Sequence, residues 1–199
     1  MGPPAAKDAA ISMTRFSVRL SFVRGRFFRG ADCKPDKNQM QALLELLRGK
    51  GAHVDPIACV EDIDAELAQR HVEGFPHSIA DLVFHMNYWM NYELKRIRGE
   101  KPKYPKHNAE SFPDTPQEWN HLKRDFSWFV GEFAKLAQSS SDEMNRQIES
   151  VHEGDKKVAG TLEAVLSQMV AHNSYHTAQI AMLRRALNAW PPRAGGDTW

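Results

Sequence analysis

The chain has 199 residues, a formal net charge of +1 and 42% hydrophobic residues, which indicates one soluble domain with a sizeable core. Its apolar runs are only a few residues long, so no membrane-spanning helix is expected. Its two cysteines, Cys33 and Cys59, are isolated, which argues against a disulfide scaffold and a thiolate zinc site and fits a reducing cytoplasm.

Residues 1–35 differ in charge from the rest of the chain. They hold seven lysines and arginines against two aspartates, a balance of about +5, which leaves about −4 for residues 36–199. Their apolar residues fit both a helical and a strand spacing, so periodicity leaves their structure open. We expect a basic, disordered extension, and a translation start assigned upstream of the true one would explain it. An organelle transit peptide and a nucleic-acid-binding arm are the alternatives.

Two helices are predicted between residues 40 and 71. The first is short, has one apolar face and ends at Gly49. The second is predicted to begin at Asp55-Pro56, an N-cap residue followed by proline at the first helical position, and to run to about His71. Its acidic residues are expected to form a solvated face, although one of them could turn inward. They are Glu61, Asp62, Asp64 and Glu66.

A third helix is predicted from Ser78 to about Arg98. Ser78 and Asp81 fit an S-x-x-D capping box at its start, and Gly99 follows its end. The apolar positions between these ends are closely spaced, which predicts a broad buried face.

The rest of the chain is predicted to hold two more helices and two connections. Residues 99–114 contain several prolines and form a loop. A capping box at Thr115–Glu118 opens the next helix, which runs to Leu136. Residues 138–160 are a long polar connection that either covers a site or holds a short hairpin. The last helix runs from Thr161 to about Ala189.

These elements predict an all-α fold in one domain that spans residues 36–199. The four long helices, of which the first is the one at residues 55–71, are expected to form an antiparallel four-helix bundle. The helix at residues 40–47 is then an additional short N-terminal helix.

The last helix carries histidines on the side that should face the core. Its apolar seam steps by four and three from Leu162 to Leu187, and Asn173 and His176 occupy places in this seam. His172 lies one turn before His176 on the same side. Burying such polar groups costs about 1 to 3 kcal/mol each unless they are hydrogen-bonded or coordinated, so the fold must satisfy them.

A metal ion is one way to satisfy these imidazoles. His85 lies beside apolar positions of the third predicted helix, so His85, His172 and His176 could converge in the core. Zinc and other borderline divalent ions bind such imidazole nitrogens. The spacing by itself is weak support, since about 0.4 HxxxH pairs are expected by chance in this chain.

The alternative is a set of core histidines without metal. They would then be hydrogen-bonded to the backbone or to Asn173, Gln179 and Tyr88. Among the remaining histidines, only His77, just before the predicted cap at Ser78, is kept as a further candidate ligand.

Three stretches carry the most specific pattern of the chain: FPHSIADLVFHMNYW at residues 75–89, AHNSYHTAQIAMLRRALNAWPP at residues 171–192, and the ending GGDTW. They resemble the DinB superfamily of bacterial four-helix bundles, over about residues 40–199. The resemblance implies a divalent metal ion, often nickel or zinc, held by His85, His172 and His176. Residues 1–35 have no counterpart in it, which favours the extension.

Three histidine ligands leave an open coordination position, as in catalytic zinc sites. The resemblance implies a metal-dependent hydrolase or a transferase that uses a low-molecular-weight thiol, with a small-molecule substrate. Asp81 is a weak candidate for a proton acceptor, because the capping box already explains it. Asn173, Gln179 and Tyr88 are candidates to support the ligands or to face the substrate.

Two other functions stay open from the sequence. The bundle could bind a metal ion or small ligand without turnover, in a stress response. The basic arm could bind nucleic acid, in which case binding would be sensitive to salt. A homodimer through an exposed bundle face is compatible with the sequence but is not indicated by it.

Overall fold

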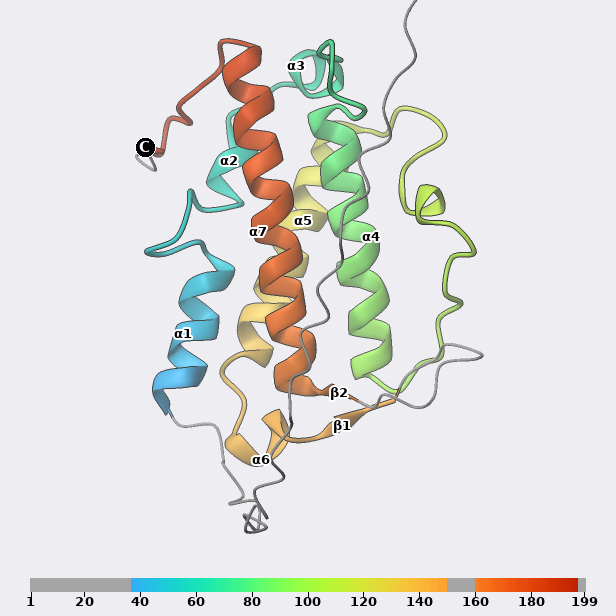
Figure 1. Ribbon diagram of the computed structural model, residues 1–199, viewed down its shortest axis with the longest axis vertical. Helices are drawn as coiled ribbons and strands as arrows, with labels where there is room; N and C mark the ends of the chain where they lie inside the picture. Colours follow the sequence, from blue (N-terminus) through green and yellow to red (C-terminus); the bar gives the residue numbers. More distant parts are fainter. Residues whose placement is uncertain (1–36, 150–159, 197–199) are drawn as a thin grey trace, which may run out of the picture. The chain divides into compact units, whose positions relative to one another are not determined.

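The computed structural model describes residues 37–149 and 160–196 (Figure 1). The basic extension predicted for residues 1–35 lies outside the described residues. None of the described helices is long and apolar enough to cross a membrane. The elements in chain order are α1 (Lys37–Leu47), α2 (Ala58–Glu61), α3 (Ala65–Gln69), α4 (Ile79–Ile97), the 3-10 helix η1 (Asn108–Ser111), α5 (Trp119–Leu136), α6 (Ser141–Met144), β1 (Gln147–Ile148), β2 (Gly160–Thr161) and α7 (Leu162–Ala186).

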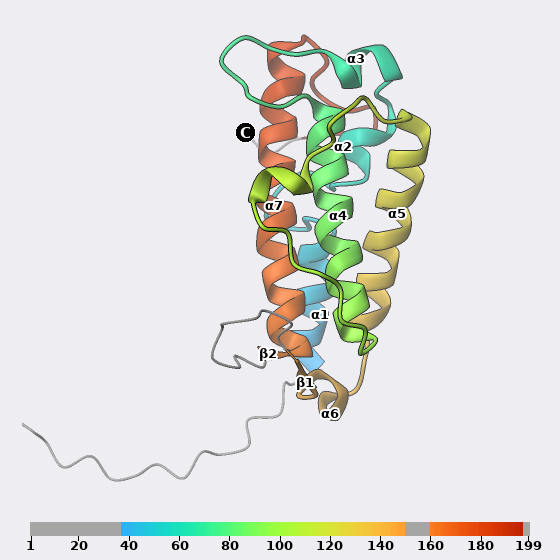
Figure 2. The same cartoon turned by 90° about the vertical axis from the view of Figure 1, so that its right-hand side faces the viewer.

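Helices α1, α4, α5 and α7 pack side by side as a bundle (Figure 1, Figure 2). Helices α4 and α1 each contact both α5 and α7, so the four helices enclose one core. The predicted all-α bundle is therefore confirmed. Helices α1 and α7 run in one direction and α4 and α5 in the other (Figure 1). The neighbours α4 and α5 run parallel, and not antiparallel as predicted, because residues 98–118 lead the chain back to the end at which α4 began (Figure 2).

The first half of the domain differs from the prediction in two places. Helix α1, predicted as an additional short helix, is itself one of the four bundle helices. The single helix predicted for residues 55–71 is wrong, because residues 62–64 separate two short helices there. Asp64 has an extended backbone (φ −82°, ψ 171°), and its side chain accepts the Leu67 N–H as the N-cap of α3. This side-chain cap stabilises a new helix start at a point where the apolar spacing alone would continue the old helix.

The predicted apolar seam of the last helix faces the core. Leu162, Leu166 and Ile180 on α7 are at most 1% exposed. Asn173 and His176 lie on the same side of α7 and are only 3% and 7% exposed. The largest fully buried side chains that α4 and α5 contribute to this core are Ile79, Met86, Met90, Trp119, Phe126 and Phe133.

The connection before α7 holds a short hairpin, one of the two forms considered for residues 138–160. Strands β1 and β2 pair antiparallel, with Gln147 opposite Thr161. Thr161 also caps α7, since its hydroxyl accepts the Ala164 N–H, which agrees with the predicted helix start. Residues 150–159 between the strands lie outside the described residues.

Helix α5 begins later than predicted. Its N-cap is Glu118, not Thr115, and the Glu118 carboxylate accepts the N–H groups of Asn120 and His121. The buried Trp119 donates its indole N–H to the Ile63 carbonyl over 2.7 Å. This tertiary contact anchors the first turn of α5, and a local capping pattern does not reveal it.

A buried arginine joins the two short helices to α7. Arg184, 2% exposed, donates from Nη1 to the Asp62 carboxylate (2.7 Å) and to the Cys59 carbonyl (2.8 Å). Its Nε donates to the Ala189 carbonyl (2.9 Å). Asp62 is thus the acidic residue of this region that turns inward. Burial alone would raise the pKa of Asp62, but the hydrogen bonds from Arg184 and from the Arg193 N–H outweigh it and lower that pKa.

Candidate metal centre

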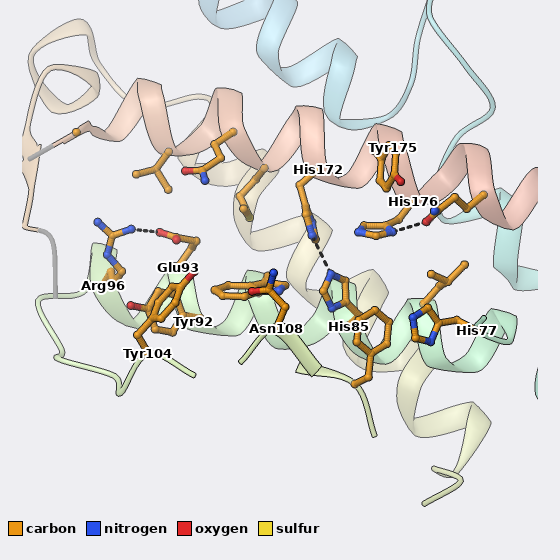
Figure 3. A pocket seen from close by; sticks show the side chains of 18 of the residues that line it. His77, His85, Tyr92, Glu93, Arg96, Tyr104, Asn108, His172, Tyr175 and His176 are labelled. Carbon is orange, nitrogen blue, oxygen red and sulfur yellow. Dashed lines mark hydrogen bonds and ion pairs between the residues drawn. The ribbon is translucent and has the colours of Figure 1, made fainter. Parts of the chain in front are cut away.

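Three imidazoles from two helices converge between α4 and α7 (Figure 3). His85 lies on the buried face of α4, and His172 and His176 lie one turn apart on α7. The Nε2 atoms of His85 and His172 are 3.2 Å apart. One ring nitrogen from each of the three lies within 4.8 Å of the others. The fold therefore brings together the three residues for which a metal site is predicted.

Hydrogen bonds orient two of these rings through their Nδ1 atoms. The Ser111 hydroxyl donates to the Asn108 carbonyl (2.5 Å), so it accepts the Nδ1 proton of His85 (2.8 Å). The side-chain oxygen of Gln179 accepts the Nδ1 proton of His176 (2.6 Å). With the proton held on Nδ1, Nε2 of each ring carries a lone pair that can bind an ion.

Burial lowers the pKa of all three histidines. The pKa of His85 falls to about 3, first through burial and then through the neighbouring His176 and His172. The pKa of His172 falls to about 4, through burial and then through His176. Burial also lowers the pKa of His176. The rings are therefore neutral near pH 7, which is the form that binds a metal ion.

The spacing and chemistry of these nitrogens fit a divalent ion. Two nitrogens that each bind one zinc ion tetrahedrally at about 2.0 to 2.1 Å are about 3.3 Å apart. The Nε2 atoms of His85 and His172 are 3.2 Å apart, which is close to this separation. Neutral imidazoles suit zinc and nickel alike, so the ligand set does not select between them.

Without bound metal, the protein is expected to lose stability as the pH falls below about 6.5. In the unfolded chain a histidine takes up its proton near its ordinary pKa of about 6.5, whereas the folded pKa is about 3 for His85 and about 4 for His172. Between these limits the unfolded state binds more protons. The histidines' contribution to stability is therefore fully present above about pH 6.5 and is lost progressively below it.

Urea unfolding of chelator-treated protein at several pH values between about 5 and 7 measures this effect, since carboxylates titrate little in that range. The matched variant replaces His85 and His172 with glutamine, and its stability should decline less steeply. An equally steep decline in this variant would show that other groups cause the acid sensitivity.

A cleft of about 910 Å³ opens onto the histidine cluster. It lies between α4 and α7, and Tyr104, Asn108 and Phe112 from the α4–α5 connection form its outer wall (Figure 3). The Phe112 ring stacks on His85 on one side and on His77 on the other, with centroid distances of 4.2 and 3.8 Å. His77, the further candidate ligand, is therefore separated from the cluster by Phe112.

The other candidate residues take different positions. The Asp81 carboxylate accepts a backbone N–H at the start of α4 and completes the capping box. Tyr88 lines a separate hollow of about 430 Å³ between α4 and α5. Asn173 is buried, and its Oδ1 lies 3.5 Å from Nδ1 of His172. Gln179 both orients His176 and lines the cleft.

Ser111 is a functional candidate that sequence reasoning did not find. Its side chain is completely buried and holds the Nδ1 proton of His85. It lies in η1, a single turn inside a proline-containing loop, where there is no apolar period to indicate which side chains turn inward. Only the three-dimensional path of the loop places Ser111 beside α4.

A family model described as DinB superfamily matches residues 55–180, a range that contains all three clustered histidines. No curated protein and no solved structure matches the chain.

Proposed function

The chain belongs to the DinB superfamily, and from this membership and its histidine cluster we propose that it uses a divalent metal ion in hydrolysis or thiol-dependent transfer on a small molecule. His85, His172 and His176 would hold the ion, and zinc and nickel are the candidates. We further propose a cytoplasmic location, because Cys59 is a buried free thiol.

The observation that carries this proposal is the position of three, not four, metal-binding side chains at an open cleft. A structural zinc site is closed by four protein ligands, whereas a catalytic site keeps a position for water or substrate. Within residues 37–149 and 160–196, the group of histidines, cysteines and carboxylates that could hold an ion has only these three members. The cleft gives a small molecule access to them.

A divalent ion at this place supplies a Lewis acid, which makes a water or thiol more acidic and polarises a carbonyl group. The chain's own residues prepare the place for it. Ser111 and Gln179 fix the rings of His85 and His176 through the Nδ1 protons. The Phe112 ring stacks on the His85 ring and covers one of its faces, and Trp89 lies edge-on to the same ring.

A second candidate function is binding of a metal ion or small ligand without turnover. Among the described residues that line the cleft, Glu93 is the one carboxylate, and it is paired with Arg96 over 2.6 Å. No other acidic side chain of that part of the chain lines the cleft as a general base. This favours either a reaction in which the ion alone activates the nucleophile, or no reaction.

Activity measurements separate these two functions. Zinc- and nickel-loaded protein is tested with ester, amide, phosphoester and thiol-acceptor substrates, beside the His176→Ala variant treated identically. Catalysis predicts turnover of at least one class by the loaded protein and none above background by the variant. Metal retention with equal background rates in both proteins would support binding without turnover.

Replacing Ser111 with alanine is expected to weaken metal binding about 10- to 100-fold, because it removes the acceptor that fixes the His85 ring. The affinity is measured by competition with a chromophoric chelator. Ser127→Ala, an exposed position on α5, is the matched control and should leave the affinity unchanged. Equal affinities of the Ser111→Ala variant and the wild type would contradict this role for Ser111.

A further inference from the structure

The cleft extends well beyond the histidine cluster, along one face of α4. The residues of this helix that line the cleft include His85, Trp89, Tyr92 and Arg96, which are spaced four, three and four apart, and Leu82 and Glu93 line it as well. At 1.5 Å of rise per residue, Tyr92 lies about 10 Å along the axis from His85. Figure 3 shows the histidines at one end of the cleft and the Arg96–Glu93 pair at the other.

The wall between these ends is mostly aromatic and apolar, although the polar side chains of Asn108 and Gln168 also line the cleft. Trp89 and Tyr104 contact each other with ring centroids 5.5 Å apart, and Val165 and Met169 face them from α7. Such a wall stabilises a bound apolar or aromatic group by removing its surface from water. A molecule that fills the cleft therefore needs an apolar middle section.

Tyr92 is the unsatisfied polar group at the far end. Its side chain lines the cleft and the residue is 5% exposed, yet its hydroxyl has no hydrogen-bond partner among residues 37–149 and 160–196. Burial raises the pKa of Tyr92 to about 12, so the hydroxyl is neutral. A buried hydroxyl without a partner costs free energy that a ligand group can recover by bonding to it.

At the far end of the cleft, the charges of Glu93 and Arg96 balance each other in an ion pair. Nη1 of Arg96 donates to the Glu93 carboxylate (2.6 Å), and its Nε and Nη2 donate to the Glu149 carbonyl (3.3 and 3.0 Å). Each guanidinium nitrogen therefore has a partner. A carboxylate on a bound molecule would lie beside Glu93 without a further counter-ion among the described residues that line the cleft, and an ammonium would lie beside Arg96.

We propose that the cleft binds an elongated small molecule with an apolar middle section and an uncharged hydrogen-bonding group at its far end, which pairs with the Tyr92 hydroxyl. An amide or an alcohol has this chemistry. The inference rests on the proposed function, because the near end of the molecule is expected to meet the ion at the three histidines. It adds a specificity-determining residue, Tyr92, two helical turns away from the reacting end.

A series of biphenyl hydroxamic acids tests this inference by binding. The hydroxamate offers two oxygen ligands to the ion, and the far ring carries a carboxamide, methyl, carboxylate or aminomethyl group. Isothermal titration calorimetry with full-length, zinc-loaded protein measures the affinities, after metal analysis of the same sample. The variants are Tyr92→Phe, which removes one hydroxyl, and Tyr88→Phe, which removes a hydroxyl of the same helix outside the cleft.

The carboxamide probe should bind the wild type about three- to tenfold more tightly than the methyl probe, as expected for one added neutral hydrogen bond. The carboxylate and aminomethyl probes should bind no more tightly than the methyl probe. Tyr92→Phe should abolish the carboxamide preference and Tyr88→Phe should retain it, with both variants folded by circular dichroism.

Three results would overturn the inference and leave the metal site intact. They are equal affinities for all four probes, tightest binding of a charged probe, and an unchanged carboxamide preference in Tyr92→Phe. Protein that contains zinc but binds none of the probes would also overturn the inference alone. If the protein takes up no zinc at all, both the proposed function and this inference are overturned.

Discussion

Replacing His176 with alanine is expected to reduce the metal content of the purified protein from about one ion per chain to nearly none. The change leaves two imidazoles, and loss of a direct ligand should weaken binding by more than the roughly 10- to 100-fold effect of removing a supporting hydrogen bond. Elemental analysis of wild type and variant, purified in parallel, measures the difference. His121→Ala is the matched control, because His121 is an exposed histidine on α5, outside the cluster.

The same variant separates a metal site from a set of packed core histidines. Added zinc at about 100 times its dissociation constant should stabilise the wild type against unfolding by about 2.7 kcal/mol. His176→Ala should gain little or nothing from zinc under the same conditions. Equal metal content and equal stabilisation in the two proteins would refute the ligand assignment, and the histidines would then be structural.

Replacing Arg184 with methionine is expected to destabilise the fold by about 3 to 5 kcal/mol, the cost of breaking a buried ion pair from one side. The methionine side chain can occupy the space but donates nothing to Asp62, Cys59 or Ala189, whose oxygens Arg184 now satisfies. Urea unfolding followed by circular dichroism measures the change in the free energy of unfolding.

Two further variants test the reason for this loss. Arg70→Met removes an exposed ion pair with Glu66 and should cost no more than about 1 kcal/mol. Asp62→Asn in the Arg184→Met background removes the uncompensated carboxylate, so the double variant should be more stable than the sum of the single changes predicts. Additive effects would mean that the unpaired Asp62 carboxylate is not the cause of the stability lost in the Arg184→Met variant.

The helices that contain long, regular apolar faces could be predicted from the sequence, and so could the histidines within them. On α7 the regular seam requires that Asn173 and His176 turn inward, and the burial of both residues confirms this. The capping box of Ser78 and Asp81 is also a local signal, and it is present at the predicted place.

The features that sequence reasoning did not find depend on contacts between distant residues. The break between α2 and α3 accompanies the pairing of Asp62 with Arg184, 122 residues away along the chain. The start of α5 accompanies the bond from Trp119 to Ile63, 56 residues away. Neither contact leaves a periodic trace in its own segment, so the apolar spacing extended the first helix too far and the capping pattern at Thr115 started the second too early.

The chain between α4 and α5 contributes both to the bundle and to the cleft. Its return path allows α4 and α5 to run parallel, and it also supplies Tyr104, Asn108 and Phe112 to the cleft, whereas the three clustered histidines lie on α4 and α7. Changes in this loop are therefore expected to alter both the lining of the cleft and the hydrogen bond that orients His85. The loop thus couples the shape of the cleft to the orientation of one clustered ring, whereas Tyr92 at the far end is held by α4 itself.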